Sequence, residues 1–221
     1  MTVNKKALAP HTSQIIESIS KLDCIRPYLL VGGTALSLQL GTRQSEDLDF
    51  MSWRISKTEK REVDWPKIKR ELEGIGEIDK MEILDLDHVE FVINKVKLSF
   101  YANPNYSPVK EEISLINNLR LADLISIGAM KMEVLLRRSK FRDYYDIYSL
   151  LEADVDLHSM IDLALKYSGH KLKSKNLLAL LTRGDRFRED ENFKSLKPIY
   201  EVTSKDIEER IKRELLAGGE K

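Results

Sequence analysis

The chain has 221 residues, of which 42% are apolar and 33% charged, and 36 basic residues balance 36 acidic ones. Zero formal charge excludes a polybasic nucleic-acid binder by composition, although a local basic patch remains possible. The single cysteine, Cys24, excludes an intramolecular disulfide framework. The apolar runs are too short to cross a bilayer and the N-terminus has no secretory pattern, so we expect a cytoplasmic protein without membrane contact.

The first fifty residues alternate between helical and extended patterns. Gly41 is a typical helix stop, and Leu48 and Phe50 alternate with Asp47 and Asp49 as in a strand with one buried face. In chain order, the patterns predict a helix over 12–22, a strand over 28–31, a helix over 34–40 and a strand over 47–51.

A charged stretch over 53–73 follows, and we expect an exposed loop and then a helix over 65–73, with Pro66 in its first turn. Strand patterns cover 80–84 and 88–102. The second is interrupted at Asn94-Lys95, which we interpret as a hairpin turn.

Pro104 and Pro108 mark a loop that closes the first half of the chain. Thr203 and Asp206 resemble a helix-capping pair. The remaining patterns predict helices over 119–138, 141–152, 159–167, 175–182 and 203–216. We therefore expect an α+β protein, with an α/β domain over 1–110 and an α-helical domain over 111–221 that completes the active site.

The segment from Leu30 to Phe50 carries the most specific chemistry. A glycine pair, Gly32-Gly33, lets backbone amides approach a bulky anion, and the following helix directs its positive end the same way. Asp47 and Asp49 project from one strand face and suit Mg²⁺, which one or two carboxylates and substrate phosphates hold. A glycine pair alone usually marks a turn, and an Asp-x-Asp pattern alone usually marks a solvated strand face. The combination of the two indicates a triphosphate site.

This segment, GGTAL followed by RQSEDLDF, resembles the AbiEii/AbiGii-type nucleotidyltransferase toxins, within the polymerase-β-type nucleotidyltransferases. The later segment AMKMEVLLRRSKFRDYYDIYSLL, over 129–151, is similar to a second motif of that family. The resemblance covers 28–151. It implies a mixed sheet, an active-site lysine at Lys131 and an acidic pair at Asp143 and Asp146, of which Asp146 would orient Lys131 or a substrate.

The resemblance implies transfer of a nucleoside monophosphate from an NTP to a hydroxyl, with Mg²⁺ or Mn²⁺ as cofactor held by Asp47 and Asp49. The acceptor would be RNA, tRNA above all, and a cognate antitoxin would be a partner of the toxin. A small-molecule transferase of the aminoglycoside-modifying kind and a non-catalytic nucleotide- or RNA-binding relative are the alternatives. Residues expected to bind the nucleotide are Gly32, Gly33, Thr34, Arg43 and Ser45; those expected to bind RNA are Arg137, Arg138, Lys140 and Arg142.

Each charged candidate has a plainer interpretation. Arg43 would form a surface ion pair with Glu46 or Asp47, and Lys131 would lie at the rim of a helix with its ammonium in water. The basic cluster would be a solvated turn, with the tyrosines that follow it, Tyr144, Tyr145 and Tyr148, in the core rather than stacked on bases.

One departure from the family pattern concerns a third carboxylate, which often serves as general base or metal ligand. Ser99 stands at the aligned position. If Asn94-Lys95 is a two-residue turn, Glu90 pairs with Ser99 across the hairpin and brings a carboxylate to the same face. We therefore predict a catalytic role for Glu90; the alternative is an ordinary exposed strand residue.

Overall fold

The computed structural model describes residues 3–59, 62–168 and 171–217. The chain divides into two compact units, unit 1 over Met1–Asp123 and unit 2 over Leu124–Lys221. Unit 1 combines a sheet with helices and unit 2 is built from helices, so the predicted α+β class is confirmed.

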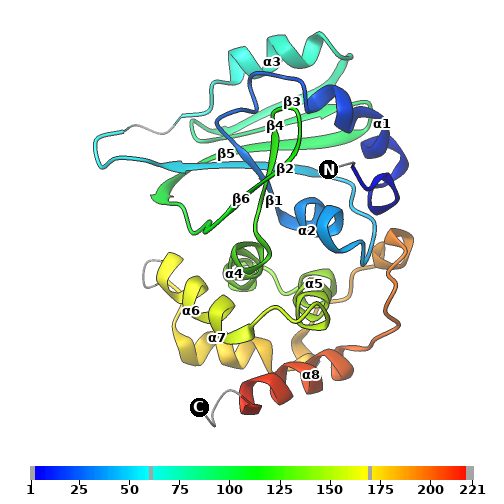
Figure 1. The fold of residues 1–221 in the computed structure, drawn as a ribbon, viewed down its shortest axis with the longest axis vertical. Helices are drawn as coiled ribbons and strands as arrows, with labels where there is room; N and C mark the ends of the chain where they lie inside the picture. The colour runs from blue at the N-terminus through cyan, green and yellow to red at the C-terminus, as the bar shows by residue number, and fades with distance from the viewer. Residues whose placement is uncertain (1–2, 60–61, 169–170, 218–221) are drawn as a thin grey trace. The chain divides into compact units, whose positions relative to one another are not determined.

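Unit 1 is built on a seven-stranded sheet with the order β3-β4-β5-β2-β1-β7-β6 (Figure 1). Its strands are β1 (Leu29–Val31), β2 (Leu48–Arg54), β3 (Ile78–Asp85), β4 (His88–Ile93), β5 (Val96–Tyr106), β6 (Glu112–Ile116) and β7 (Leu119–Ala122). Its helices are η1 (Lys5–Ala7), α1 (Pro10–Ile19), α2 (Gly32–Leu40) and α3 (Trp65–Glu73). The pairs β2/β5 and β1/β7 are parallel and the others antiparallel, which makes the sheet mixed, as the family resemblance implied.

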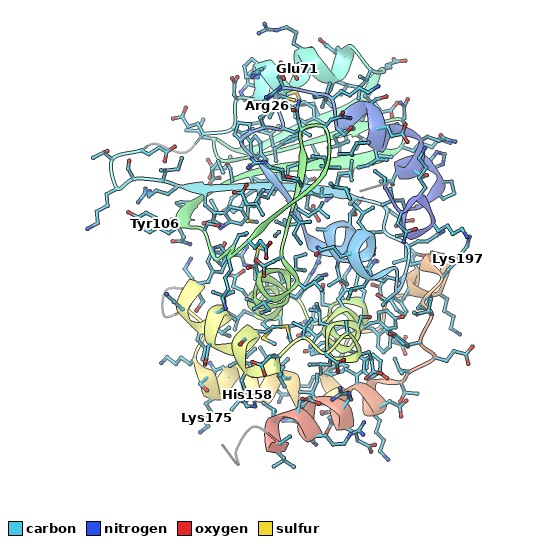
Figure 2. All side chains as sticks on the ribbon, in the orientation of Figure 1. Arg26, Glu71, Tyr106, His158, Lys175 and Lys197 are labelled. Atoms are coloured by element: carbon cyan, nitrogen blue, oxygen red, sulfur yellow. The ribbon has the colours of Figure 1, made fainter. Side chains whose placement is uncertain are left out.

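The two faces of the sheet differ in polarity. Leu48, Phe50 and Phe100 are at most 2% exposed, and the rings of Phe50 and Phe100 stack at 5.0 Å. In Figure 1, α3 lies above the sheet and α1 at its right-hand end, and the Cys24 amide after α1 donates to Glu71 of α3 at 2.8 Å (Glu71 is labelled in Figure 2). The alternating residues of β2, β4 and β5 lie half-buried on the opposite face, so this face is accessible to a ligand.

The predicted hairpin between β4 and β5 is confirmed, with Ile93 opposite Val96. Asn94 and Lys95 both have positive φ, 50° and 66°, as a two-residue turn with both central residues left-handed requires. The turn therefore fixes the register of the hairpin.

The expected helical start at 119 is wrong, because residues 112–122 form the hairpin β6–β7. Asn117, with φ of 49°, begins its turn, and Leu121 pairs in parallel with Leu30. Pro104 lies within β5 rather than in a closing loop. Residues 111–123 thus belong to the sheet unit, beyond the expected domain boundary at 110, because β7 completes the hydrogen bonding of β1.

Unit 2 consists of helical elements: α4 (Leu124–Val134), α5 (Phe141–Glu152), α6 (Leu157–Tyr167), α7 (Ser174–Leu181), η2 (Gly184–Arg186), η3 (Phe193–Leu196) and α8 (Ser204–Ala217). The four helices predicted over 141–216 are confirmed within two residues at each end. The Thr203–Asp206 cap is also confirmed, since the Thr203 amide donates to Asp206 at 2.7 Å and the Asp206 amide to the Thr203 hydroxyl at 3.3 Å. No helix within the described residues has the length and apolar character needed to cross a membrane.

Candidate nucleotide-binding site

The glycine corner and the acidic strand converge in unit 1. Val31, the last residue of β1, pairs with Asp49 of β2, and Gly32 follows with φ of +67°. A Cβ on Gly32 would lie 2.8 Å from Asp49 Oδ2. The Asp49 carboxylate therefore occupies the space that any other side chain would fill, and the glycine is required both by its conformation and by this close approach.

The second glycine lies against Arg43 and Ser45. A Cβ on Gly33 would lie 2.5 Å from Arg43 Nη2 and 3.3 Å from Ser45 Oγ. Arg43 is 4% exposed and donates from Nη1 to the Gln44 carbonyl at 2.9 Å. The surface-pair interpretation of Arg43 is thus wrong, because the guanidinium is buried beside the glycine corner.

The N-terminal segment holds the loop that carries these residues. The Ser45 amide donates to the Ala7 carbonyl at 3.0 Å, and the Ala9 amide donates to the Ser45 carbonyl at 2.9 Å. Thr12 adds a bond from Oγ1 to the Glu46 carbonyl at 2.5 Å. Residues near the N-terminus, outside the motif, therefore fix the backbone position of the two residues that precede Asp47.

Thr34 has a positioning contact. Thr34 is 1% exposed, and its hydroxyl is hydrogen-bonded to Ser45 Oγ at 2.8 Å and donates to the Asp47 carbonyl. The Thr34 side chain thus links the first turn of α2 to Asp47, the residue before β2. The backbone amides of Gly32, Gly33 and Thr34 are among the first four of α2, which have no intrahelical acceptor and favour an anion.

One ammonium group connects the acids of this face. Lys97 Nζ lies 3.2 Å from Glu90 Oε1. Partial burial would lower the pKa of Lys97, but the bond to Glu90 and the charges of Glu90, Asp47 and Asp49 outweigh it and raise the pKa above its ordinary value. Glu90, Asp47 and Asp49 therefore lie in one electrostatic neighbourhood.

The residues present fit a magnesium ion brought with a nucleotide. Asp47 and Asp49 are half-buried, so their carboxylates are not sealed beneath packed side chains. Within residues 3–59, 62–168 and 171–217, no three His, Cys, Asp or Glu side chains gather closely enough to hold a metal by themselves. Mg²⁺ is typically held by one or two carboxylates together with substrate phosphates. The Asp49 carboxylate lies directly against Gly32, where phosphates would be bound, so the acid and the phosphates would be close enough to share an ion.

The predicted pairing of Glu90 with Ser99 is confirmed, and Ser99 pairs in turn with Asp49. His88 joins this row: its Nε2 lies 3.1 Å from Ser99 Oγ and 3.6 Å from Glu90 Oε1. His88 and Lys97 were not among the predicted site residues. The signal was present, since His88 precedes Glu90, and Lys97 precedes Ser99, by two residues on the same strand face.

The acidic pair and lysine of the second motif meet inside unit 2. Lys131 is 6% exposed, and its Nζ lies 3.1 Å from Asp143 Oδ1 and 2.6 Å from Asp146 Oδ2. Arg138 adds a bond to Asp143 at 3.2 Å. The rim interpretation of Lys131 is therefore wrong, while the catalytic role predicted for Lys131 and Asp146 stays a prediction.

The basic cluster is largely engaged in ion pairs. Arg137 binds Glu133 at 3.2 Å, Arg138 binds Asp143, and Arg142 Nη2 binds Asp190 at 2.8 Å, while Lys140 is exposed. Tyr144 and Tyr145 are fully buried, with Tyr144 stacked on Phe187. The core interpretation of these two tyrosines is confirmed, so they cannot stack on bases.

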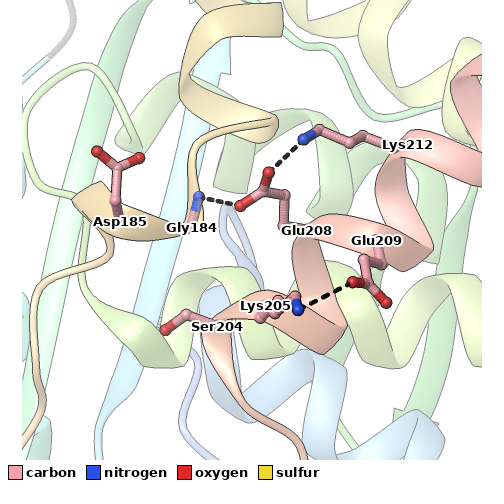
Figure 3. A pocket seen from close by; sticks show the side chains of 7 residues that line it. All are labelled: Gly184, Asp185, Ser204, Lys205, Glu208, Glu209 and Lys212. Carbon is pink, nitrogen blue, oxygen red and sulfur yellow. Dashed lines mark hydrogen bonds and ion pairs between the residues drawn. The ribbon is translucent and has the colours of Figure 1, made fainter.

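A surface pocket in unit 2 has none of the predicted site residues in its lining (Figure 3). Glu208 accepts from the Gly184 amide at 2.7 Å and pairs with Lys212, and Lys205 pairs with Glu209 at 3.8 Å. The pocket is lined by Gly184, Asp185, Ser204, Lys205, Glu208, Glu209 and Lys212. Asp185 pairs with Arg183 outside this lining, so these contacts engage each charged residue of the pocket.

The mixed sheet, the glycine corner and the adjacent acid strand define a nucleotidyltransferase fold. MenT4, a nucleotidyltransferase toxin from Mycobacterium tuberculosis, has a similar structure, with a TM-score of 0.58 and 16% identity over 95% of this chain and 79% of that one. JHP933 from Helicobacter pylori is similar with a TM-score of 0.51 and 18% identity, over 96% of this chain and 98% of that one.

The sequence is 24% identical to the protein aq_aa25 of Aquifex aeolicus (strain VF5) over 95% of this chain and 97% of that protein. The family described as "Nucleotidyl transferase AbiEii toxin, Type IV TA system" matches residues 15–217. The chain belongs to this family of nucleotidyltransferase toxins.

Proposed function

We propose that the protein transfers a nucleoside monophosphate from an NTP to a hydroxyl of RNA, as the toxin of a toxin–antitoxin system. The observation that carries this proposal is the contact between the glycine corner and the acid strand, where Asp49 Oδ2 lies 2.8 Å from the Cβ position that Gly32 leaves empty. A triphosphate held at the corner would lie beside both aspartates.

The chain contributes positioning and charge. The first amides of α2 would hold phosphate oxygens, and buried Arg43 would place positive charge beside Gly33. Asp47 and Asp49 would hold Mg²⁺ or Mn²⁺, and the bound ion would supply positive charge to the phosphates and the attacking hydroxyl. The Thr34 hydroxyl keeps Asp47 in place by donating a hydrogen bond to the Asp47 carbonyl. Such transfers depend on orientation more than on covalent help.

The proposal of an RNA acceptor is supported by the family resemblance and by the exposed cations Arg137 and Lys140. The proposal of an antitoxin partner is supported by the family resemblance alone. A small-molecule acceptor remains the alternative. The replacement of the third acid by Ser99 favours a second candidate, a non-catalytic member that binds nucleotide or RNA.

The test incubates the purified protein and Mg²⁺ with each labelled NTP and either total RNA, purified tRNA or an aminoglycoside panel. Label on RNA supports the proposal, and label on aminoglycosides alone supports the alternative acceptor. Asp49→Asn should abolish transfer without changing the thermal melting curve, because it removes charge and retains shape. Asp23→Asn, at an exposed ion pair with Arg26, is the matched control and should remain fully active. An Asp49→Asn variant as active as the parent would contradict the assigned site.

Lys131 requires a separate comparison, because its buried contacts also support the fold. Lys131→Arg retains the positive charge between Asp143 and Asp146. If Lys131 takes part in transfer, this variant should fold normally and lose at least tenfold in kcat. Parental kcat would assign Lys131 to structure alone.

A further inference from the structure

The sheet face that carries the acids lacks the third carboxylate, and Glu90 is poorly placed to replace it as a proton acceptor. Its Oε1 is bound by Lys97 Nζ at 3.2 Å. The lone pair of Glu90 that accepts from this ammonium group is not available to an incoming hydroxyl. A second group on this face that can receive the proton of the attacking hydroxyl would therefore serve the proposed transfer.

Ser99 and His88 are next to each other at the required position. Ser99 pairs with Asp49 on one side and with Glu90 on the other. Its hydroxyl oxygen lies 3.1 Å from His88 Nε2, within hydrogen-bond distance. A neutral imidazole with its proton on Nδ1 accepts at Nε2, so the serine hydroxyl can donate to the histidine.

We propose that Ser99 and His88 form a proton relay that replaces the missing carboxylate; this inference rests on the proposed function. The acceptor hydroxyl gives its proton to Ser99 Oγ, while the Ser99 proton passes to His88 Nε2. The acceptor oxygen forms a bond to the α-phosphorus, the bond from that phosphorus to the bridging oxygen breaks, and pyrophosphate leaves with the electron pair. The imidazolium then releases its proton to water, because the His88 side chain is 32% exposed.

The surroundings of His88 suit this role. Glu90 Oε1, 3.6 Å from Nε2, lies close enough to stabilise the positive imidazolium without replacing Ser99 as its hydrogen-bond partner. Tyr101 of β5 contacts the ring edge to face at 5.6 Å, and Asp85 of β3 pairs with His88 along the sheet. Lys97, which is bound to Glu90, is a cation on the same face of β5 as Ser99.

The test measures single-turnover transfer with saturating NTP between pH 5 and 9. His88→Gln should lower the rate about 10²-fold or more, as expected for loss of acid–base catalysis. Ser99→Asp restores the family carboxylate and should make His88 dispensable, so the His88→Gln/Ser99→Asp double variant should recover to within about tenfold of the parent. The parent should lose rate at acid pH, because a protonated imidazole cannot accept the Ser99 proton, and the double variant, which has no histidine at this position, should be less sensitive to acid.

Three results would overturn the relay: a parental rate in His88→Gln, a double variant as slow as His88→Gln, or Glu90→Gln slower than Ser99→Ala. Circular dichroism and NTP binding by each variant establish that the fold and the corner are intact. A parent that transfers no label overturns the proposed function, and the relay with it. An active parent whose rate is indifferent to His88 overturns the relay alone.

Discussion

The buried charge cluster of unit 2 gives the most quantitative prediction. Lys131→Met removes the ammonium that lies between Asp143 and Asp146, whose side chains have no solvent exposure. Breaking a buried ion pair from one side costs about 3–5 kcal/mol. Arg138 still binds Asp143 at 3.2 Å, so the loss should lie near the lower end, about 3 kcal/mol, and arise mainly from Asp146.

The assay is urea unfolding followed by far-UV circular dichroism, with hydrogen exchange of the α5 amides as the local measurement. Tryptophan fluorescence is unsuitable, because both tryptophans, Trp53 and Trp65, lie in unit 1. With an m value of about 2 kcal/mol/M, the midpoint should fall by about 1.5 M. Lys205→Met, which removes an exposed pair with Glu209, should change stability by less than about 0.5 kcal/mol.

A double variant isolates the cause. Lys131→Met with Asp146→Asn no longer buries the unpaired charge and should recover at least 1 kcal/mol of the roughly 3 lost. If Lys131→Met matches Lys205→Met, or if Asp146→Asn makes it worse, the buried pair does not stabilise unit 2 in the way described.

Three further predictions concern unit 1. Gly32→Ala should lose about 1–2 kcal/mol of stability and most of the transfer activity, because φ of +67° strains alanine and its Cβ meets Asp49; normal thermal melting with normal kcat would contradict both reasons. Burial and then the charge of Glu71 raise the pKa of the Cys24 thiol to about 12, so at pH 8 a maleimide should label the native protein far more slowly than the urea-unfolded one, and equal rates would refute this. Lys95→Gly should raise the unfolding free energy by about 0.5–1 kcal/mol, since glycine accommodates φ of 66° without strain, and a lower urea midpoint would count against the described turn.

The parts of the structure that sequence patterns predicted are those with local causes. The glycine corner, the acid alternation of β2 and the Asn94-Lys95 turn each depend on a few consecutive residues. The same local turn placed Glu90 opposite Ser99, because a two-residue connection fixes every later pair.

The parts that were missed depend on remote partners. The residues of β7 have an apolar pattern compatible with either a helix or a strand, and only the pairing of Leu121 with Leu30 decides between them. Lys131 was open to a rim interpretation because the two carboxylates that bury it are on the next helix. His88 shares a strand face with Glu90 in the sequence pattern, but its contact with Ser99, eleven residues away across the hairpin, is what makes it a candidate site residue.

The pairing of β7 with β1 also governs how the chain can be divided and synthesised. β1 is three fully buried residues long, and β2 covers only one of its edges. A fragment that stops at residue 110 would leave the other edge open to strands of neighbouring molecules, which is a route to aggregation. An expression fragment of the sheet should therefore extend through Asp123, and a nascent chain on the ribosome cannot close this sheet until Ala122 has emerged.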